Sequence, residues 1–159
     1  MICKVSSSLF FKRNDWIIKE IITEIIIDTK PEKVWEVLTD FENYPTWNPF
    51  IQKISGEQKV GLKLDVSIHP LEGNGMTFQP TLLKFEENRE FRWVGKLLVK
   101  GIFDGEHYFV LSQEVGNKTK FTHGEKFRGI LVYFAGKILD KTKDGFELMN
   151  ESLKIEYEK

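Results

Sequence analysis

One segment, residues 28–50 with the sequence DTKPEKVWEVLTDFENYPTWNPF, constrains the fold of this chain more than any other. Thr29 and the glutamate three residues later have the spacing of a capping box, and Pro31 lies in the first turn, where a missing N–H costs little. A helix is therefore expected to begin here. Further on, Pro45 disfavours helical geometry at the residue before it, and together with Pro49 it limits any second helix to about one turn. The segment predicts a helix, a kink and a second short helix.

Aromatic side chains are concentrated in this bent unit. Five of them fall within sixteen residues, which is more apolar surface than a helical turn can bury against itself. They are Trp35, Phe41, Tyr44, Trp47 and Phe50. The rest of the chain must therefore supply a concave apolar surface that receives them.

Runs with the period-two pattern of β-strands account for much of the chain outside this unit. They span residues 18–27, 51–56, 62–68, 76–87, 90–98, 102–115 and 118–127. Pro80 lies inside the fourth run, which predicts a bulge or an edge position in one long strand. Gly116 and Asn117 join the last two runs and can both adopt a positive φ, so a hairpin with a two-residue turn is expected. Seven strands joined in this way predict a strongly curved antiparallel sheet.

The C-terminal part of the chain predicts one long amphipathic helix, from about Leu131 to Glu156. Apolar or small residues recur there at steps of three and four, and they form one face that can cover the sheet. They are Leu131, Ala135, Ile138, Thr142, Gly145, Phe146, Met149 and Leu153. A glycine in the middle of a helix costs about 1 kcal/mol relative to alanine. Gly145 therefore predicts a close approach to a strand or room for a bound molecule, unless it is a tolerated weak position.

Length and composition indicate one domain with a sizeable core, because the chain has 159 residues of which 41% are hydrophobic. We expect residues 18–159 to form this domain. Residues 1–17 show no clear period and are expected to form an N-terminal extension, part of which can be disordered. The charges nearly cancel, with 23 basic and 24 acidic residues, so neither a nucleic acid nor an anionic membrane is expected as a partner.

Several classes of protein and of site are not expected. Cys3 is the single cysteine, so neither an internal disulfide nor a cysteine-based metal site can form. No apolar run approaches the length of about eighteen residues that a membrane-spanning helix needs. The first eleven residues lack the cleavage site of a signal peptide. The resulting expectation is a cytoplasmic protein without a cofactor or integral membrane association, acting as a monomer or a homodimer.

The order of these elements resembles the START-like superfamily, also called SRPBCC, and within it the bacterial polyketide cyclase/dehydrase-like branch. The likeness covers roughly residues 18–157 and is carried by the segment PEKVWEVLTDFENYPTWNPF, by GIFDGEHYFVL at 101–111 and by TKFTHGEKFRG at 119–129. It implies an α+β helix-grip fold, in which a curved seven-stranded antiparallel sheet grips a long C-terminal helix and two short helices follow the first strand. It also implies an elongated cavity with residues 47–50 near its mouth. The superfamily includes lipid carriers, hormone receptors and cyclases, so the resemblance predicts fold better than function.

His107, His123 and Glu125 form the sharpest candidate site, because alternation directs all three toward the inner face of two neighbouring strands. Two imidazoles and a carboxylate match a metal site in residue type, and they also match a general acid/base pair with its orienting group. Hydrogen-bonded polar groups that line a mixed cavity, or orient a ligand there, are the more common case. A two-residue turn pairs odd with even positions, so the three share a face only if a bulge shifts the register.

Binding of a hydrophobic or amphipathic small molecule in an internal cavity is the function that the resemblance favours. The residues expected to bind this ligand are Trp47, Phe50, Phe78, Trp93, His107, Phe109, His123, Glu125, Phe127, Phe146 and Met149. Trp47, Trp93 and Phe146 in particular are expected to line or rim one continuous pocket.

Two other functions remain open from the sequence. The first is an enzyme of the cyclase/aromatase or dehydratase type, with His107, His123 and Glu125 as its acid/base groups. The second is an adaptor whose open cleft binds another protein, as the chaperone-activating relatives do. A pocket closed on all sides would favour a small-molecule ligand, and a shallow, filled one would favour the adaptor.

Overall fold

The computed structural model describes residues 18–69, 75–97, 103–129, 132 and 136–158. The predicted N-terminal extension, residues 1–17, lies outside these residues. The helices and strands follow one another as β1 (Ile18–Ile27), α1 (Pro31–Thr39), the 3-10 helix η1 (Phe41–Asn43), α2 (Tyr44–Trp47), β2 (Ile51–Ser55), β3 (Asp65–Ile68), β4 (Met76–Phe78), β5 (Thr81–Glu86), β6 (Glu90–Leu97), β7 (Phe103–Glu114), β8 (Lys118–Arg128) and α3 (Gly136–Glu158).

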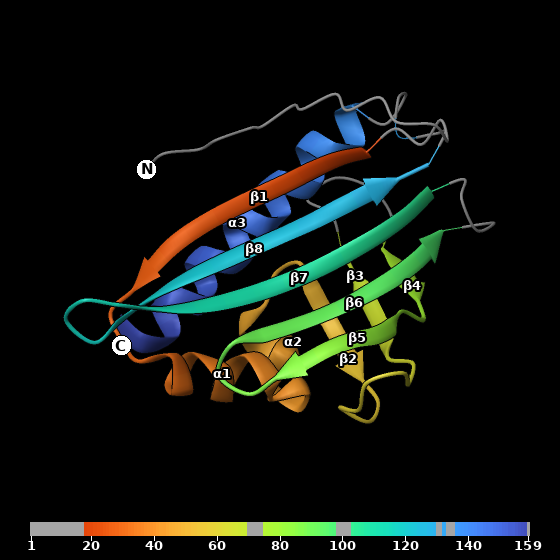
Figure 1. Ribbon diagram of the computed structural model, residues 1–159. Helices are drawn as coiled ribbons and strands as arrows, with labels where there is room; N and C mark the ends of the chain where they lie inside the picture. Colours follow the sequence, from red (N-terminus) through yellow and green to blue (C-terminus); the bar gives the residue numbers. More distant parts are fainter. Residues whose placement is uncertain (1–17, 70–74, 98–102, 130–131, 133–135, 159) are drawn as a thin grey trace.

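The strands form two antiparallel sheets, and the smaller one lies behind β5 and β6 in the view of Figure 1. Five strands pair in the order β1-β8-β7-β6-β5, and three pair in the order β2-β3-β4. Three backbone hydrogen bonds tie the chain before β3 to the start of β5. In them Gly61 N–H donates to Leu82 O at 2.8 Å, while Leu64 N–H donates to Pro80 O and Leu82 N–H donates to Leu62 O, both at 2.9 Å. The helix-grip α+β fold expected from the sequence is therefore confirmed.

The long helix α3 lies against the concave side of the five-stranded sheet, behind β1 and β8 in Figure 1, and α1 and α2 lie at the lower end of the molecule in that view. Phe146, Met149 and Leu153 on α3 are fully buried, whereas Lys137 is exposed. The predicted apolar stripe thus faces the sheet. No helix in the described part of the chain is long and apolar enough to cross a membrane.

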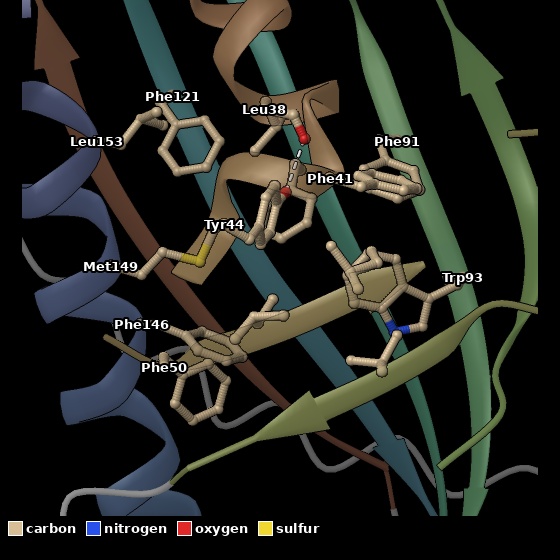
Figure 2. Close-up of a cluster of buried hydrophobic side chains, with 14 of the residues drawn as sticks. Leu38, Phe41, Tyr44, Phe50, Phe91, Trp93, Phe121, Phe146, Met149 and Leu153 are labelled. Carbon is tan, nitrogen blue, oxygen red and sulfur yellow. Dashed lines mark hydrogen bonds between the residues drawn. The ribbon is translucent and has the colours of Figure 1, made fainter. Parts of the chain in front are cut away.

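Aromatic residues fill the space between the bent helical unit and the sheet (Figure 2). Phe41 stacks on Phe91 of β6 with ring centroids 5.6 Å apart, and the Tyr44 hydroxyl donates a hydrogen bond to Leu38 O at 2.7 Å. The five aromatic residues of the unit are all buried. A concave apolar surface does receive them, as predicted.

The number of strands differs from the prediction, because the described residues contain eight rather than seven. The run at 76–87, expected to be one long strand, is divided into β4 and β5, which belong to different sheets. Pro80 lies at the break. Proline cannot donate a ladder hydrogen bond, so the chain leaves one sheet there and enters the other. The strand expected at 62–68 is also shorter, since β3 begins at Asp65.

The ends of two helices differ as well. Lys30, not Thr29, is the N-cap of α1, and no side chain makes a cap hydrogen bond, so the predicted capping box is wrong. Tyr44 is helical despite preceding Pro45, because its carbonyl accepts the Asn48 N–H at 2.9 Å and closes the single turn of α2. That single turn agrees with the prediction.

The C-terminal helix is described from Gly136 onward, and its predicted start near Leu131 lies outside the described residues. Residues 130–131 and 133–135, which include the predicted stripe position Ala135, lie outside the described residues. Gly145 is buried, and a Cβ placed there would lie 2.4 Å from Phe50 Cδ2. The glycine does allow a close approach, but to the ring of Phe50 in the bend before β2 and not to a strand as predicted.

Candidate ligand-binding site

A partly enclosed cavity of about 80 Å³ lies between the inner face of the sheet, the short strands β2 to β4 and α3. Six of the eleven residues predicted from the sequence line it: Phe50, Phe78, Trp93, His107, Glu125 and Phe127. The other lining residues in the described part of the chain are Ile51, Ile68, Met76, Gly95, Gly105 and Thr142. The walls are therefore mainly aromatic and aliphatic.

The other five predicted residues do not line the cavity and lie in the buried interior: Trp47, Phe109, His123, Phe146 and Met149. Of the three residues expected to rim one pocket, Trp93 alone contributes to this cavity. The reason is Phe50, whose ring packs over Gly145 and lies edge-on to Phe146 with centroids 5.4 Å apart. This ring fills the space that the glycine was expected to leave for a ligand.

Two glycines on neighbouring strands give the cavity its depth. Gly95 of β6 and Gly105 of β7 are directly paired. A Cβ at Gly95 would lie 3.2 Å from the ring of Phe78, and a Cβ at Gly105 would lie 2.3 Å from Oε1 of Glu125. Side chains at either position would displace these groups, so the two glycines make room for the Phe78 ring and the Glu125 carboxyl group.

The register of the β7–β8 hairpin brings the polar residues together. The turn has three residues, 115–117, rather than the two that were predicted. Odd positions therefore pair with odd positions, and His107 lies directly opposite Glu125 while Phe109 lies opposite His123. The three polar residues share the inner face without the bulge that the sequence argument required.

Hydrogen bonds and one longer polar contact, to Glu125, link these residues into a chain that continues into α3 and β1. His107 Nδ1 lies 3.5 Å from Oε2 of Glu125, and His107 Nε2 lies 2.9 Å from His123 Nε2. His123 Nδ1 lies 3.0 Å from Asn150 Oδ1, and Asn150 Nδ2 donates to the Thr23 hydroxyl at 2.8 Å. That hydroxyl donates in turn to the backbone carbonyl of His123 at 3.1 Å. We call these five residues the polar chain.

Aromatic rings hold the two imidazoles in place. The indole of Trp93 stacks on His107 with ring centroids 4.6 Å apart and an interplanar angle of 2°. Phe146 stacks on His123 with centroids 3.8 Å apart and an angle of 16°. Because each ring is fixed by stacking and by hydrogen bonds, neither imidazole can turn to present a different atom to the cavity without disrupting its neighbours.

Burial determines the charge of the polar chain. It lowers the pKa of His107 to about 3, and it lowers the pKa of His123 well below its ordinary value, with His107 adding to the effect. It raises the pKa of Glu125 to about 8. At neutral pH both imidazoles are therefore uncharged and Glu125 holds its proton.

Asn150 and Thr23 are members of the polar chain that sequence reasoning missed. Asn150 lies one helical turn after Phe146, on the face of α3 that carries the apolar stripe, and it is 3% exposed. Thr23 lies on an inward position of the Ile-rich strand β1. In both cases the available signal was a polar residue at a position where periodicity predicts an apolar one.

Other kinds of site have less support among the described residues. No group of three or more His, Cys, Asp or Glu side chains there is arranged to hold a metal ion. A wider and more open groove of about 500 Å³ lies between η1 and β2, and its lining includes Asp40, Glu42 and Gln58. Its lining mixes polar and apolar surface and is broadly open to solvent, which suits an apolar ligand less well than an enclosed cavity does.

Residues 20–149 match the profile of a protein family described as "Polyketide cyclase / dehydrase and lipid transport". The chain belongs to this family. The match covers most of the sequence and includes β1 from its third residue, all the other strands of the described residues, the bent helical unit and much of α3. A search of curated protein sequences found no match.

Several solved structures share the fold of this chain at low sequence identity. A START superfamily protein from Mycobacterium smegmatis superposes with a TM-score of 0.70 at 16% identity, covering 87% of this chain and 97% of that one. A protein of unknown function, SA2116 from Staphylococcus aureus, gives 0.66 at 15% identity over 87% and 93% of the two chains. The di-domain ARO/CYC BexL from the BE-7585A biosynthetic pathway gives 0.69 at 11% identity, covering 89% of this chain and 50% of that one. At these identities the likeness establishes the fold alone.

Proposed function

We propose that this protein binds a small hydrophobic or amphipathic molecule in the cavity between the sheet and α3. The observation that carries the proposal is a cavity whose walls are mainly aromatic and aliphatic and whose polar groups, His107 and Glu125, lie together on adjacent strands. Such a combination of an apolar wall with a few convergent polar groups is typical of small-molecule sites.

The size of the cavity supports a ligand. One water molecule needs about 10 to 15 Å³ of such space, so about 80 Å³ exceeds a single structural water several-fold.

A ligand larger than the cavity can be accommodated at its edge. Met76 and Phe78 line the cavity from β4, a strand of three residues at the edge of the small sheet, and both are only half-buried. Methionine is flexible and fills irregular gaps readily. Movement of these two side chains would lengthen the cavity while the polar end stays in place.

An enzyme of the cyclase or dehydratase type is the second candidate. Glu125 favours it, because a carboxylic acid whose pKa is raised to about 8 can donate and accept protons near neutral pH. His123 cannot exchange a proton directly with a ligand in the cavity, because it lies behind His107 and does not line the cavity wall. Consumption of a bound ligand by the wild-type protein, absent in Glu125→Gln, would establish this second function.

Filling the cavity tests the binding proposal. Thr142 lines the cavity from α3, and Asp144 is exposed on the same helix. Thr142→Trp should weaken the binding of 4-methylphenol at least about tenfold, because the indole occupies the space that the ligand needs. Asp144→Trp adds the same side chain outside the cavity and should leave the affinity unchanged. Isothermal titration calorimetry measures both, and equal affinities in the two variants would contradict the proposal.

A further inference from the structure

The directions of the hydrogen bonds in the polar chain can be assigned from its buried end. The Thr23 hydroxyl donates to the His123 carbonyl oxygen, which can only accept. Thr23 must therefore accept from Asn150, whose Nδ2 faces it at 2.8 Å. The carbonyl oxygen of the same amide then faces His123 Nδ1. This places the hydrogen of His123 on Nδ1.

The tautomer of His123 in turn determines that of His107. With one hydrogen on Nδ1, neutral His123 carries a lone pair on Nε2. His107 must then donate from its own Nε2 across the 2.9 Å contact between the two rings. The remaining nitrogen of His107, Nδ1, is left as an acceptor on the side of Glu125.

Glu125 supplies the complementary donor. If Glu125 were ionised, its Oε2 and the lone pair of His107 Nδ1 would be two hydrogen-bond acceptors 3.5 Å apart. Two buried acceptors that face each other without a donor between them are unfavourable. The protonated acid avoids this conflict, and burial favours it independently by raising the pKa of Glu125. A separation of 3.5 Å is long for a direct O–H···N hydrogen bond. Both residues line the cavity, so a donor and an acceptor lie beside each other in its wall.

We propose that Glu125 and His107 together recognise a hydroxyl group on the ligand. The ligand oxygen accepts a hydrogen bond from the Glu125 acid and donates its own hydrogen to His107 Nδ1. The inference rests on the proposed function and narrows its ligand class to an alcohol or phenol with a compact apolar body. A ketone can use only the donor, and a carboxylate ligand would have to give up its hydration without meeting a cation in the wall.

Asn150 acts as a positioning residue in this scheme, because it touches the ligand site only through His123 and His107. By accepting a hydrogen bond from His123 Nδ1, Asn150 helps to fix the tautomers of His123 and His107. It thereby helps to keep the His107 nitrogen beside Glu125 as a hydrogen-bond acceptor. This role predicts a signature that packing alone does not require.

Nitrogen-15 NMR of histidine-labelled protein reads that signature directly. At neutral pH the expected result is a hydrogen on Nδ1 of His123 and on Nε2 of His107, and the other ring nitrogen of each histidine should be unprotonated. The opposite tautomers, or a cationic ring at either position, would overturn the inference whether or not a ligand has been found.

Matched probes test the ligand class. 4-Methylphenol and 4-fluorotoluene have nearly the same shape, but only the first can donate a hydrogen bond. Replacing Glu125 with methionine removes the donor, and the ratio of the two affinities should shift about tenfold against the phenol. Glu125→Gln keeps an N–H donor and should hold the ratio within about threefold of wild type. Glu114→Met, at the exposed end of β7, is the control and should leave the ratio unchanged.

The outcomes separate this inference from the function on which it rests. If both probes bind in the cavity and Glu125→Met leaves their ratio as in wild type, the hydroxyl assignment is wrong and the binding function stands. If the carboxylate 4-methylbenzoate binds more tightly than the phenol, the assignment is also wrong. If none of the three probes binds, both proposals fail together.

Discussion

The position and the pKa of the Glu125 carboxyl group depend on a glycine on the neighbouring strand. The space occupied by its carboxyl group exists because Gly105, on the adjacent strand, has no Cβ. The carboxyl group is thereby held against the cavity wall, with its side chain 18% exposed, where burial raises its pKa to about 8. His107 beside it has its pKa lowered to about 3 by the same burial. One desolvated site thus stabilises the uncharged form of an acid and of a base.

The raised pKa of Glu125 predicts how stability depends on pH. A carboxyl group whose pKa is higher in the folded protein keeps its proton there while the unfolded chain has lost it. Its stabilising contribution is therefore complete below the ordinary pKa of glutamate and is lost as the pH rises through about 8. Between pH 6.5 and 8.5 we expect the free energy of unfolding to fall by about 1 to 2 kcal/mol.

Variants isolate this effect from other titrating groups. Glu125→Gln cannot ionise, so its free energy of unfolding should decline less over the same interval, as measured by urea denaturation at a series of pH values. The two buried histidines affect mainly a different pH range. Because their pKa values are lowered in the folded protein, their titration reduces the free energy of unfolding mainly as the pH falls below about 6.5. Glu114→Gln, an exposed substitution at the end of β7, should follow the wild type. Parallel curves for wild type and Glu125→Gln would show that the carboxyl group is not held neutral.

At the scale of elements, single residues in the connections decide which side chains meet. The third residue in the β7–β8 turn places His107 opposite Glu125, and a two-residue turn would have moved one strand's polar groups to the outer face. Likewise, α3 can lie close to the chain before β2 because Gly145 leaves room for the ring of Phe50. The cavity ends where this ring begins.

Gly145 and Gly136 form a matched pair for testing the packing of α3. Alanine is favoured over glycine in a helix by about 1 kcal/mol, so propensity alone predicts that both substitutions stabilise. At Gly145, however, a Cβ would lie 2.4 Å from the Phe50 ring, while at Gly136 it would meet nothing within 4 Å. We expect Gly145→Ala to lower the free energy of unfolding by about 1 to 3 kcal/mol and Gly136→Ala to be neutral or stabilising. Thermal and urea denaturation measure both changes, and a stabilised Gly145→Ala would show that α3 is packed less tightly than described.

At the scale of the whole molecule, periodicity and aromatic content predicted a curved antiparallel sheet covered by a long helix, and the resemblance to the START-like superfamily implied the helix-grip fold. The inward faces of β6 to β8, the stripe on α3 and the burial of the bent helical unit all follow from residue spacing. Features that depend on one residue of register were not predictable: the three-residue turn, and the division of a long strand at Pro80. The extent of the cavity was not predictable either, because it depends on which neighbour fills the space beside a glycine. Phe50 does so at Gly145, whereas Phe78 and Glu125 leave a cavity at Gly95 and Gly105.

The indole N–H signals of the tryptophans provide the most direct measurement of the central claim, that the cavity between sheet and helix binds a small molecule. Trp93 lines the cavity, whereas Trp35 and Trp47 are buried and do not line it. In a titration of nitrogen-15-labelled protein with 4-methylphenol, with signals assigned by single Trp→Phe variants, the account predicts a saturable shift of Trp93 and small shifts of the other two. An unmoved Trp93 signal at saturating ligand, or a larger shift at Trp35 than at Trp93, would contradict it.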